Sequence, residues 1–241
     1  MLEINGLSKS YGSHKAVDNL SMRIANGEIH GFIGHNGAGK TTTLRSIAGI
    51  MQFEEGTITI DGHSIKEEPL ACKKIMAYIP DNPDLYEFMS GIQYLNFIAD
   101  IFGVDVSTRD ERIHRYTDLF EITNVLDDAI SSYSHGMKQK VCLMASLIHN
   151  PAIWILDEPT VGLDIIVYQT LMDMLREFAA NGKTVFITSH NIDLVSRICN
   201  RVAIINNGVV AELIDFSKEP LKRRNLSNIF FSTYAVEKKP E

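Results

Sequence analysis

Nine residues, GHNGAGKTT at positions 34–42, carry the clearest structural signal in the chain. They fit the pattern G-x-x-x-x-G-K-[ST], in which glycines let backbone N–H groups surround phosphate oxygens. Lys40 supplies a positive charge to the β- and γ-phosphates, and the hydroxyl of Thr41 is a ligand for Mg²⁺. The pattern has this meaning only between a strand and a helix. An apolar run at 28–34 and a helical pattern at 40–49 supply both, so we predict a phosphate-binding loop.

A second motif, AIWILDEPT at 152–160, ends an apolar strand with two carboxylates. Asp157, at the end of the strand, can hold Mg²⁺ through water. The carboxylate of Glu158 can orient an attacking water or accept its proton. Paired acids at a strand end are otherwise often a solvated turn, and the phosphate-binding loop earlier in the chain favours the catalytic interpretation.

Strand and helix patterns alternate on both sides of these motifs. Further strands are expected at 75–80, 184–190 and 201–208, and further helices at 165–180 and 192–199. This alternation predicts βα units around a mostly parallel sheet, and hence the fold class α/β.

Three segments depart from the alternation. The run GTITIDG at 56–62 alternates apolar and polar residues between glycines, which predicts a strand of an antiparallel sheet. Residues 90–148 are helical in pattern and predict an insertion into the parallel sheet. The turn NNG at 206–208, followed by VVAEL, predicts a β-hairpin.

Composition narrows the functional classes. Of 241 residues, 45% are hydrophobic and 22% are charged, as in ordinary folded domains. The net charge of −7 disfavours duplex nucleic acid and an anionic bilayer as direct partners. The N-terminal residues lack the apolar segment of a signal peptide, and no apolar run approaches the ~18 residues of a membrane span. Contact with a membrane would therefore need another chain.

Three cysteines, Cys72, Cys142 and Cys199, are far apart and form no CxxC pair. We expect reduced, buried thiols and a reducing compartment, which agrees with a cytoplasmic location.

The stretch YSHGMKQK at 133–140 predicts a second helix start, in addition to the one at the phosphate-binding loop. Ser134 is placed to cap a helix that includes the apolar run 141–148. Helix N-termini attract anions, so one chain with a single phosphate-binding loop would present two phosphate-facing helix starts.

Together these motifs resemble the nucleotide-binding subunit of an ABC transporter, over nearly the whole chain. They occur in the family's order: an aromatic residue at Tyr11, Walker A at 34–41, a Q-loop after AYIP, a signature at 133–137, Walker B ending at Asp157 and followed by Glu158, a D-loop VGLD ending at Asp164, and a switch histidine at His190. Several motifs in order are far more specific than any one of them.

The resemblance implies a P-loop NTPase core of ABC type, with a mostly parallel sheet, an antiparallel β subdomain and an inserted α-helical subdomain. The whole chain, 1–241, would be a single ATP-binding domain. The helical subdomain would span about 82–150, and a C-terminal extension about 215–241.

The resemblance also implies that ATP and Mg²⁺ are bound. It implies catalytic roles for Glu158, His190 and Lys40, and metal ligation by Thr41, Asp81 and Asp157. The nucleotide contacts that it implies are Tyr11, Gly34, His35, Asn36, Gly37, Ala38, Gly39, Lys40, Thr41, Thr42, Asp81, Ser134, Gly136, Asp164 and His190.

Some positions depart from the family pattern or allow a second interpretation. Asp81 stands where the family usually has glutamine, His135 where it has glycine, and Met137 where it has glutamine. Tyr11 can instead be an exposed turn tyrosine, and His190 a polar cap of its strand. Asp164 can equally be the N-cap of the following helix.

By resemblance, two such subunits face each other head to tail, and a homodimer is expected. Ser134 and Gly136 of one subunit would close over the γ-phosphate held by Lys40 of the other, which answers why one chain has two phosphate-facing helix starts. The expected function is ATP hydrolysis that powers a transporter, expected to be an exporter, whose transmembrane permease is a separate chain. The subunit would lie on the cytoplasmic face of the cell membrane and touch the membrane only through the permease.

The alternative class is a soluble ABC-type ATPase that acts on ribosomes or DNA. The single phosphate-binding loop and the net charge of −7 argue against it, as does the lack of a heptad run or cysteine cluster in the sequence. A P-loop kinase or GTPase is disfavoured by the signature that precedes Walker B.

The loop DNPDLYEFMSG at 81–91 holds four large apolar residues, Leu85, Tyr86, Phe88 and Met89. They either cover the core of the helical insertion or form a groove for a cytoplasmic helix of the permease.

Overall fold

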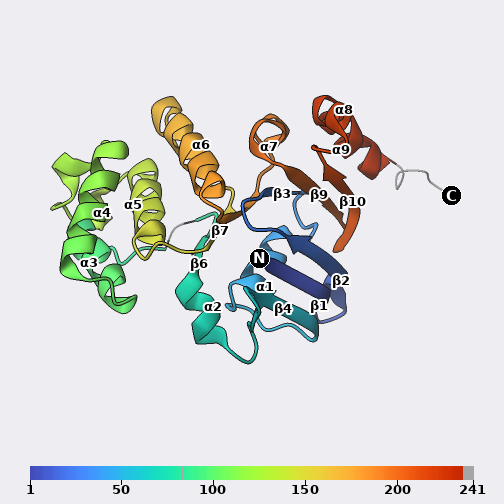
Figure 1. Ribbon diagram of the computed structural model, residues 1–241, viewed down its shortest axis with the longest axis horizontal. Helices are drawn as coiled ribbons and strands as arrows, with labels where there is room; N and C mark the ends of the chain where they lie inside the picture. The colour runs from blue at the N-terminus through green and yellow to red at the C-terminus, as the bar shows by residue number, and fades with distance from the viewer. Residues whose placement is uncertain (83, 236–241) are drawn as a thin grey trace.

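The computed structural model describes residues 1–82 and 84–235 and centres on a six-stranded sheet (Figure 1). The order of the strands is β10-β9-β3-β8-β7-β6. Neighbours from β9 to β6 run parallel, and β10 pairs antiparallel with β9. The bounds are β3 (Ile29–Ile33), β6 (Met76–Ile79), β7 (Ile153–Asp157), β8 (Thr184–Thr188), β9 (Arg201–Asn206) and β10 (Val209–Asp215). The predicted α/β class, the mostly parallel sheet and the hairpin at 206–208 are confirmed.

An antiparallel sheet lies beside it, with the order β2-β1-β4-β5. Its strands are β1 (Leu2–Tyr11), β2 (His14–Ile24), β4 (Glu55–Ile60) and β5 (His63–Ser64). The strand expected at 56–62 is confirmed as β4. The residue pattern does not predict β1 and β2, because their register shifts at several points between Ile4 and Ser10, and each shift interrupts the alternation of apolar and polar residues.

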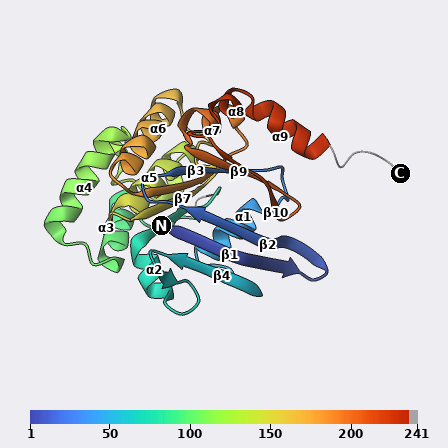
Figure 2. The same cartoon turned by 45° about the vertical axis from the view of Figure 1, so that its right-hand side comes forward.

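The central sheet is covered on both faces, as Figure 2 shows. The helices α6 (Ile165–Ala180) and α7 (Ile192–Ile198) cover one face, and α1 (Lys40–Ile47) lies between the other face and the antiparallel sheet. The core residues of β7 alternate accordingly: Trp154 and Leu156 belong to one buried cluster, whereas Ile153 and Ile155 belong to the other. A buried strand with apolar residues on both faces is typical of a parallel sheet.

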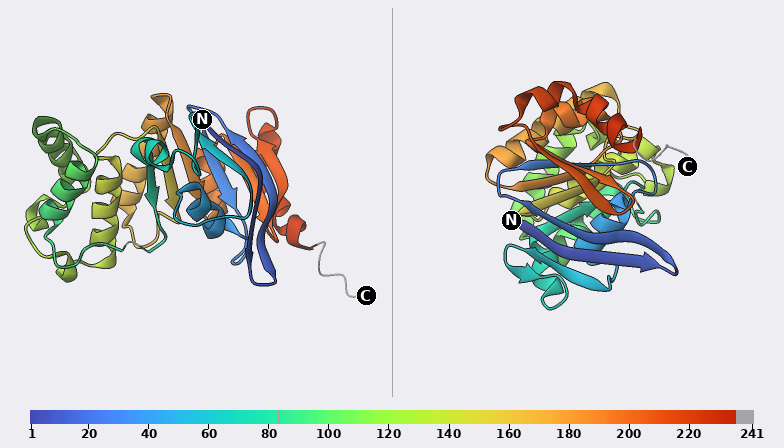
Figure 3. Two further views of the ribbon diagram at one scale, coloured as in Figure 1. Left: turned by 90° about the horizontal axis from the view of Figure 1, so that it is seen from below. Right: turned by 90° about the vertical axis from the view of Figure 1, so that its right-hand side faces the viewer.

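Three helices form a separate group at the β6 end of the sheet (Figure 3, left). They are α3 (Gly91–Ile101), α4 (Val106–Leu119) and α5 (His135–Leu147), and the short 3₁₀ turns η1 (Thr123–Val125) and η2 (Ile130–Ser132) lie between α4 and α5. Ser90 caps α3 in a reciprocal capping box with Gln93. All three helices follow β6 and precede β7, so the helical insertion expected at 90–148 is confirmed in its place.

The remaining helices are α2 (Pro69–Ile75), before β6, and α8 (Pro220–Arg224) and α9 (Leu226–Ala235), after β10. Residues 236–241 of the predicted C-terminal extension and residue 83 of the predicted helical subdomain lie outside the described residues. Cys72 and Cys199 are buried as expected, whereas Cys142 is half-buried. Within the described part of the chain, no helix combines the length and hydrophobicity that a membrane crossing requires.

Candidate functional site

The predicted phosphate-binding loop connects β3 to α1, and its glycines are required by close backbone approaches. A Cβ atom at Gly34 would lie 2.6 Å from the carbonyl oxygen of Ile205. Gly39 has a φ of +106°, and a Cβ atom there would collide with the carbonyl of Ala16. Only glycine fits both positions, so the loop is held between β9 and β2.

Lys40 folds back across this loop. Its Nζ donates to the carbonyl oxygens of Gly34 (2.7 Å) and His35 (3.0 Å). Burial lowers the pKa of Lys40, and the charges of Glu158 and Asp157 oppose that shift. A buried ammonium held mainly by carbonyl dipoles favours a nearby anion. The loop therefore fits the terminal phosphates of a nucleotide.

Asp157 lies at the centre of a buried hydrogen-bond network. Its Oδ2 accepts from the hydroxyl of Thr41 (2.9 Å), and its Oδ1 accepts from the hydroxyl of Thr188 (2.5 Å). Asp157 and Thr188 are partners in the register of β7 and β8. A carboxylate beside a hydroxyl is an oxygen donor set that Mg²⁺ prefers, so these residues fit the metal.

Glu158 and His190 meet at the same edge of the sheet. Oε2 of Glu158 accepts from the backbone N–H of His190 (3.2 Å) and lies 2.9 Å from His190 Nδ1. The backbone N–H of Glu158 donates to the hydroxyl of Thr188 (3.1 Å). Glu158 has a φ of +49°, a conformation uncommon for a residue other than glycine. The side chain of His190 is 72% exposed and that of Glu158 16%, so the carboxylate is held in place while the imidazole faces outward.

Tyr11 lies beside the phosphate-binding loop, although it precedes the loop by more than twenty residues. One hollow is lined by Tyr11, His14, Ala16, Asn36, Gly37, Gly39, Lys40, Thr41 and Thr42. Tyr11 is 48% exposed, and the ammonium of Lys9 lies 5.6 Å from the centre of its ring. An open aromatic face at the rim of this hollow fits the flat ring of a base.

Ser134 caps α5 as predicted, because its Oγ accepts from the N–H of Met137 (3.3 Å). Among the described residues that line the hollow beside Lys40, Ser134 and Gly136 do not occur. The structure of one chain therefore does not bring the second helix start to its own phosphate-binding loop.

The segment at the start of α5 instead contacts the turn after Glu158. A Cβ atom at Gly136 would lie 2.7 Å from the carbonyl of Gly162, and one at Gly162 would lie 2.5 Å from the ring of His135. The side chain of the buried Gln139 donates to the carbonyl of Pro159 (3.2 Å). The predicted signature and the predicted D-loop are thus in direct contact within one chain.

Asp164 and Asp81 have local partners. Asp164 is the N-cap of α6 and accepts from the N–H groups of Ile166 (3.0 Å) and Val167 (2.9 Å), which confirms its capping role. The hydrogen bond from Val167 is the main cause that lowers the pKa of Asp164. Asp81 is exposed, follows β6 and accepts from the N–H of Asn82 (3.0 Å).

Sequence reasoning missed Thr188, which holds both Asp157 and Glu158, and Ala16, whose carbonyl confines Gly39. The available signal for Thr188 was a hydroxyl in the last position of a buried strand that ends beside Walker B. The carbonyl of Ala16 has no sequence signal, because any residue there supplies one.

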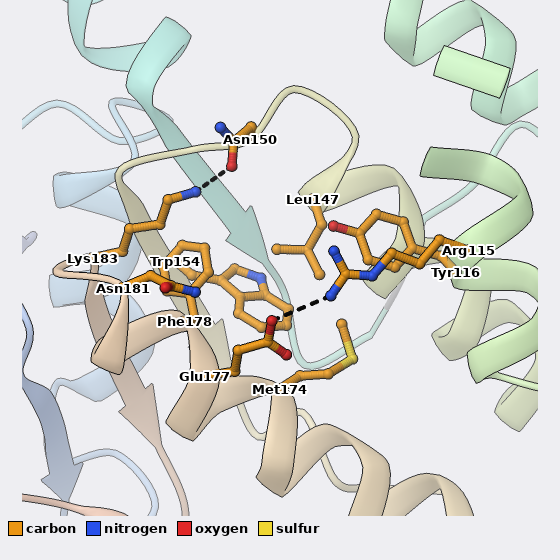
Figure 4. Close-up of a pocket in the computed structure, with 10 residues that line it drawn as sticks. All are labelled: Arg115, Tyr116, Leu147, Asn150, Trp154, Met174, Glu177, Phe178, Asn181 and Lys183. Carbon is orange, nitrogen blue, oxygen red and sulfur yellow. Dashed lines mark hydrogen bonds and ion pairs between the residues drawn. The ribbon is translucent and has the colours of Figure 1, made fainter. Parts of the chain in front are cut away.

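A second cavity, of about 100 Å³, lies away from these residues, between α4 and α6 (Figure 4). Arg115 of α4 donates to Glu177 of α6 at 3.3 Å, and each side chain is at least 60% exposed. Figure 4 shows this pair beside Trp154 and Met174. An exposed ion pair contributes little stability, so this pair adds little to the packing between α4 and α6.

Comparisons with known proteins agree with this site. The family described as "ABC transporter" matches residues 17–161. YhcH of Bacillus subtilis (strain 168), an uncharacterized ABC transporter ATP-binding protein, is 35% identical over 221 residues, which cover 91% of this chain and 71% of YhcH. The linearmycin resistance ATP-binding protein LnrL of the same strain is 31% identical over 208 residues, covering 86% of this chain and 67% of LnrL.

A solved structure described as the ATP-binding subunit of an ABC transporter superposes with a TM-score of 0.91 at 28% identity. The match covers 97% of this chain and 99% of that one. The chain therefore belongs to the ABC transporter family, as an ATP-binding subunit and an ATPase.

Proposed function

We propose that this subunit binds ATP with Mg²⁺ between Tyr11 and the phosphate-binding loop and hydrolyses it to power a separate permease. The observation that carries the proposal is the position of Glu158. Its carboxylate is held by His190 at the sheet edge where the Asp157–Thr41 pair and Lys40 also lie. One edge thus offers a cation for phosphate, oxygen ligands for a metal and a base for water.

Each side chain has a role that follows from its surroundings. Lys40 would bind the terminal phosphates, and Thr41 and Asp157 would hold the metal, with Asp81 as a further oxygen donor. Glu158 would orient a water and accept its proton, and His190, whose ring is exposed, would contact the γ-phosphate. Bound Mg²⁺ would supply charge that stabilises the transferring phosphoryl group.

We further propose that two copies share the nucleotides. Ser134 caps the N-terminus of α5 and is not among the described residues that line the hollow beside Lys40 of its own chain. In a head-to-tail homodimer, Ser134 and Gly136 of one copy would close over the nucleotide of the other, and Asp164 would lie near the same interface.

Export through a permease is the transport role that we propose. The name of LnrL states resistance to linearmycin, which is a role for that protein and supports export here. Phe88 is 80% exposed, Tyr86 is 49% exposed, and their rings stack at 5.9 Å, while Leu85 is buried. The exposed pair suits an apolar helix of the permease. The subunit would then lie on the cytoplasmic face of the membrane, with no direct membrane or nucleic acid contact.

The exposed ion pair between α4 and α6 suits this role. We propose that the chain is one ATP-binding domain, 1–241, in which residues about 82–150 form a helical subdomain that passes motion to the permease. The exposed Arg115–Glu177 pair would allow α4 to shift relative to α6.

The substitution Glu158→Gln tests the catalytic assignment. The amide keeps the shape of the side chain and loses the base, so we expect ATP binding to be retained and turnover to be abolished. Steady-state hydrolysis and calorimetric binding of ATP measure the two effects. Hydrolysis close to that of the wild type would exclude Glu158 as the base.

A further inference from the structure

The C-terminal helix α9 reaches the phosphate-binding loop. It contacts β9 and α7 at the β9–β10 end of the sheet (Figure 1). Leu226 is buried, and Ile229, Phe230 and Tyr234 pack against the core at helical spacing. Phe231, on the same helix, is 65% exposed. The apolar face of α9 therefore fixes the place of Tyr234 in the last turn.

The hydroxyl and the ring of Tyr234 both contact the surroundings of the loop. Its hydroxyl donates to the carbonyl oxygen of Ile205 (2.6 Å). Its ring meets the ring of His35 edge-to-face, with the centres 5.1 Å apart and the planes at 73°. Edge-to-face is a favourable geometry for an aromatic pair.

Both contacts involve residues that themselves touch the phosphate-binding groups. The Ile205 carbonyl is the surface against which Gly34 fits without room for a side chain. His35 provides one of the two carbonyls that hold Lys40 Nζ, and its ring also lies 3.3 Å from Asn206 Oδ1. A shift of Gly34 and His35 would move the oxygens that orient the ammonium of Lys40.

We propose that Tyr234 is a positioning residue for nucleotide binding, and that through it α9 fixes the phosphate-binding loop in its binding conformation. Tyr234 acts through His35 and Ile205 and touches no reacting atom. The inference rests on the proposed nucleotide site at the loop. Glu158, Asp157 and His190 belong to other strand ends, so Tyr234 affects binding of ATP and leaves the chemical step intact.

The test compares Tyr234→Leu, Tyr234→Phe and the matched control Phe231→Leu in the full chain. Leucine preserves an apolar side chain on α9 and removes the ring and the hydroxyl. We expect the Kd for ATP with Mg²⁺ to rise about tenfold, or about 1.4 kcal/mol, in Tyr234→Leu. Calorimetry in a Glu158→Gln background measures Kd without hydrolysis. Tyr234→Phe retains the ring and falls between wild type and leucine, and Phe231→Leu binds like the wild type.

Kinetics separate positioning from stability. With Glu158 intact, KM for ATP rises in Tyr234→Leu while kcat at saturating ATP stays within about twofold. A merely structural role would lower the folded fraction and hence the apparent kcat, with KM unchanged. A Kd for Tyr234→Leu within about twofold of wild type, or an equal rise in Phe231→Leu, would overturn the inference.

A double-mutant cycle gives a second measurement. The effects of Tyr234→Leu and His35→Ala on Kd are expected to be less than additive, because both remove the same ring contact. Fully additive effects of the two substitutions on Kd would contradict a role for the contact between the two rings. Wild-type protein that fails to bind ATP would refute the proposed function instead, so the two failures are distinguishable.

Discussion

Replacing Thr188 with valine removes one hydroxyl from the centre of the active-site network. That hydroxyl donates to Asp157 Oδ1 at 2.5 Å and accepts from the N–H of Glu158 at 3.1 Å. Thr188 is fully buried, so water cannot replace either contact. Asp157 would retain the hydroxyl of Thr41, and the N–H of Glu158 would retain the Thr188 carbonyl at 3.3 Å.

The expected cost follows from these contacts. A hydrogen bond to a charged group contributes about 1.5–3 kcal/mol, so Thr188→Val is expected to lower the free energy of unfolding by about 2–3 kcal/mol. Because the N–H of Glu158 loses one of its two acceptors, the base is positioned less firmly, and kcat should fall by about tenfold or more. Urea denaturation of the nucleotide-free protein and steady-state ATP hydrolysis measure the two effects.

Thr184→Val is the matched control on the same strand. Thr184 is also buried, and among the described residues its hydroxyl donates to neutral acceptors, Ala25 O at 3.3 Å and Asn26 Oδ1 at 3.4 Å. We expect a loss of about 1 kcal/mol and an unchanged kcat. Equal effects of the two substitutions on unfolding and on kcat would refute a special role for Thr188.

Three other predictions concern the dimer, the permease and pH. Mixing Ser134→Arg and Lys40→Ala subunits, each inactive alone, should restore up to half of the ATPase sites; ATPase activity that stays at the level of the separate variants counts against a shared site. Phe88→Glu should prevent co-purification of the permease while basal ATPase activity is retained, and an intact pull-down excludes the apolar groove. Burial lowers the pKa of His149 to about 4. As the pH falls, the unfolded chain therefore takes up a proton on His149 at a higher pH than the folded chain does. The free energy of unfolding should fall by up to about 3 kcal/mol from pH 6.5 to 4. His149→Gln, which can still donate to the Met76 carbonyl, should make that fall shallower in urea denaturation; an equal fall contradicts the assignment.

The arrangement of the catalytic edge could be predicted because parallel strands end at a common edge. Gly34, Asp157 and His190 each follow or end a predicted strand, and the structure brings their surroundings together. The order of residues within these three motifs was informative because each of the three lies within one βα connection.

Other parts depend on register and on contacts between distant segments. Thr188 is important because β7 and β8 pair Asp157 with it, and no local pattern specifies that register. The register shifts of β1 interrupt its alternating pattern, so this long strand could not be predicted. Tyr234 contacts His35 although the two residues lie near opposite ends of the sequence. The hydrophobic pattern of α9 predicts only that one face of the helix is buried.

The contact between α5 and the turn after Glu158 has a thermodynamic consequence. Gly136 and Gly162 touch without room for a side chain, and Gln139 donates to the Pro159 carbonyl, so the two segments pack directly against each other. In the proposed dimer, the segment next to the base of one site would thus contact the helix start whose Ser134 serves the other site. Any free energy that couples the two occupancies through this contact is reciprocal: the first nucleotide changes the affinity for the second by the same factor as the second changes that for the first.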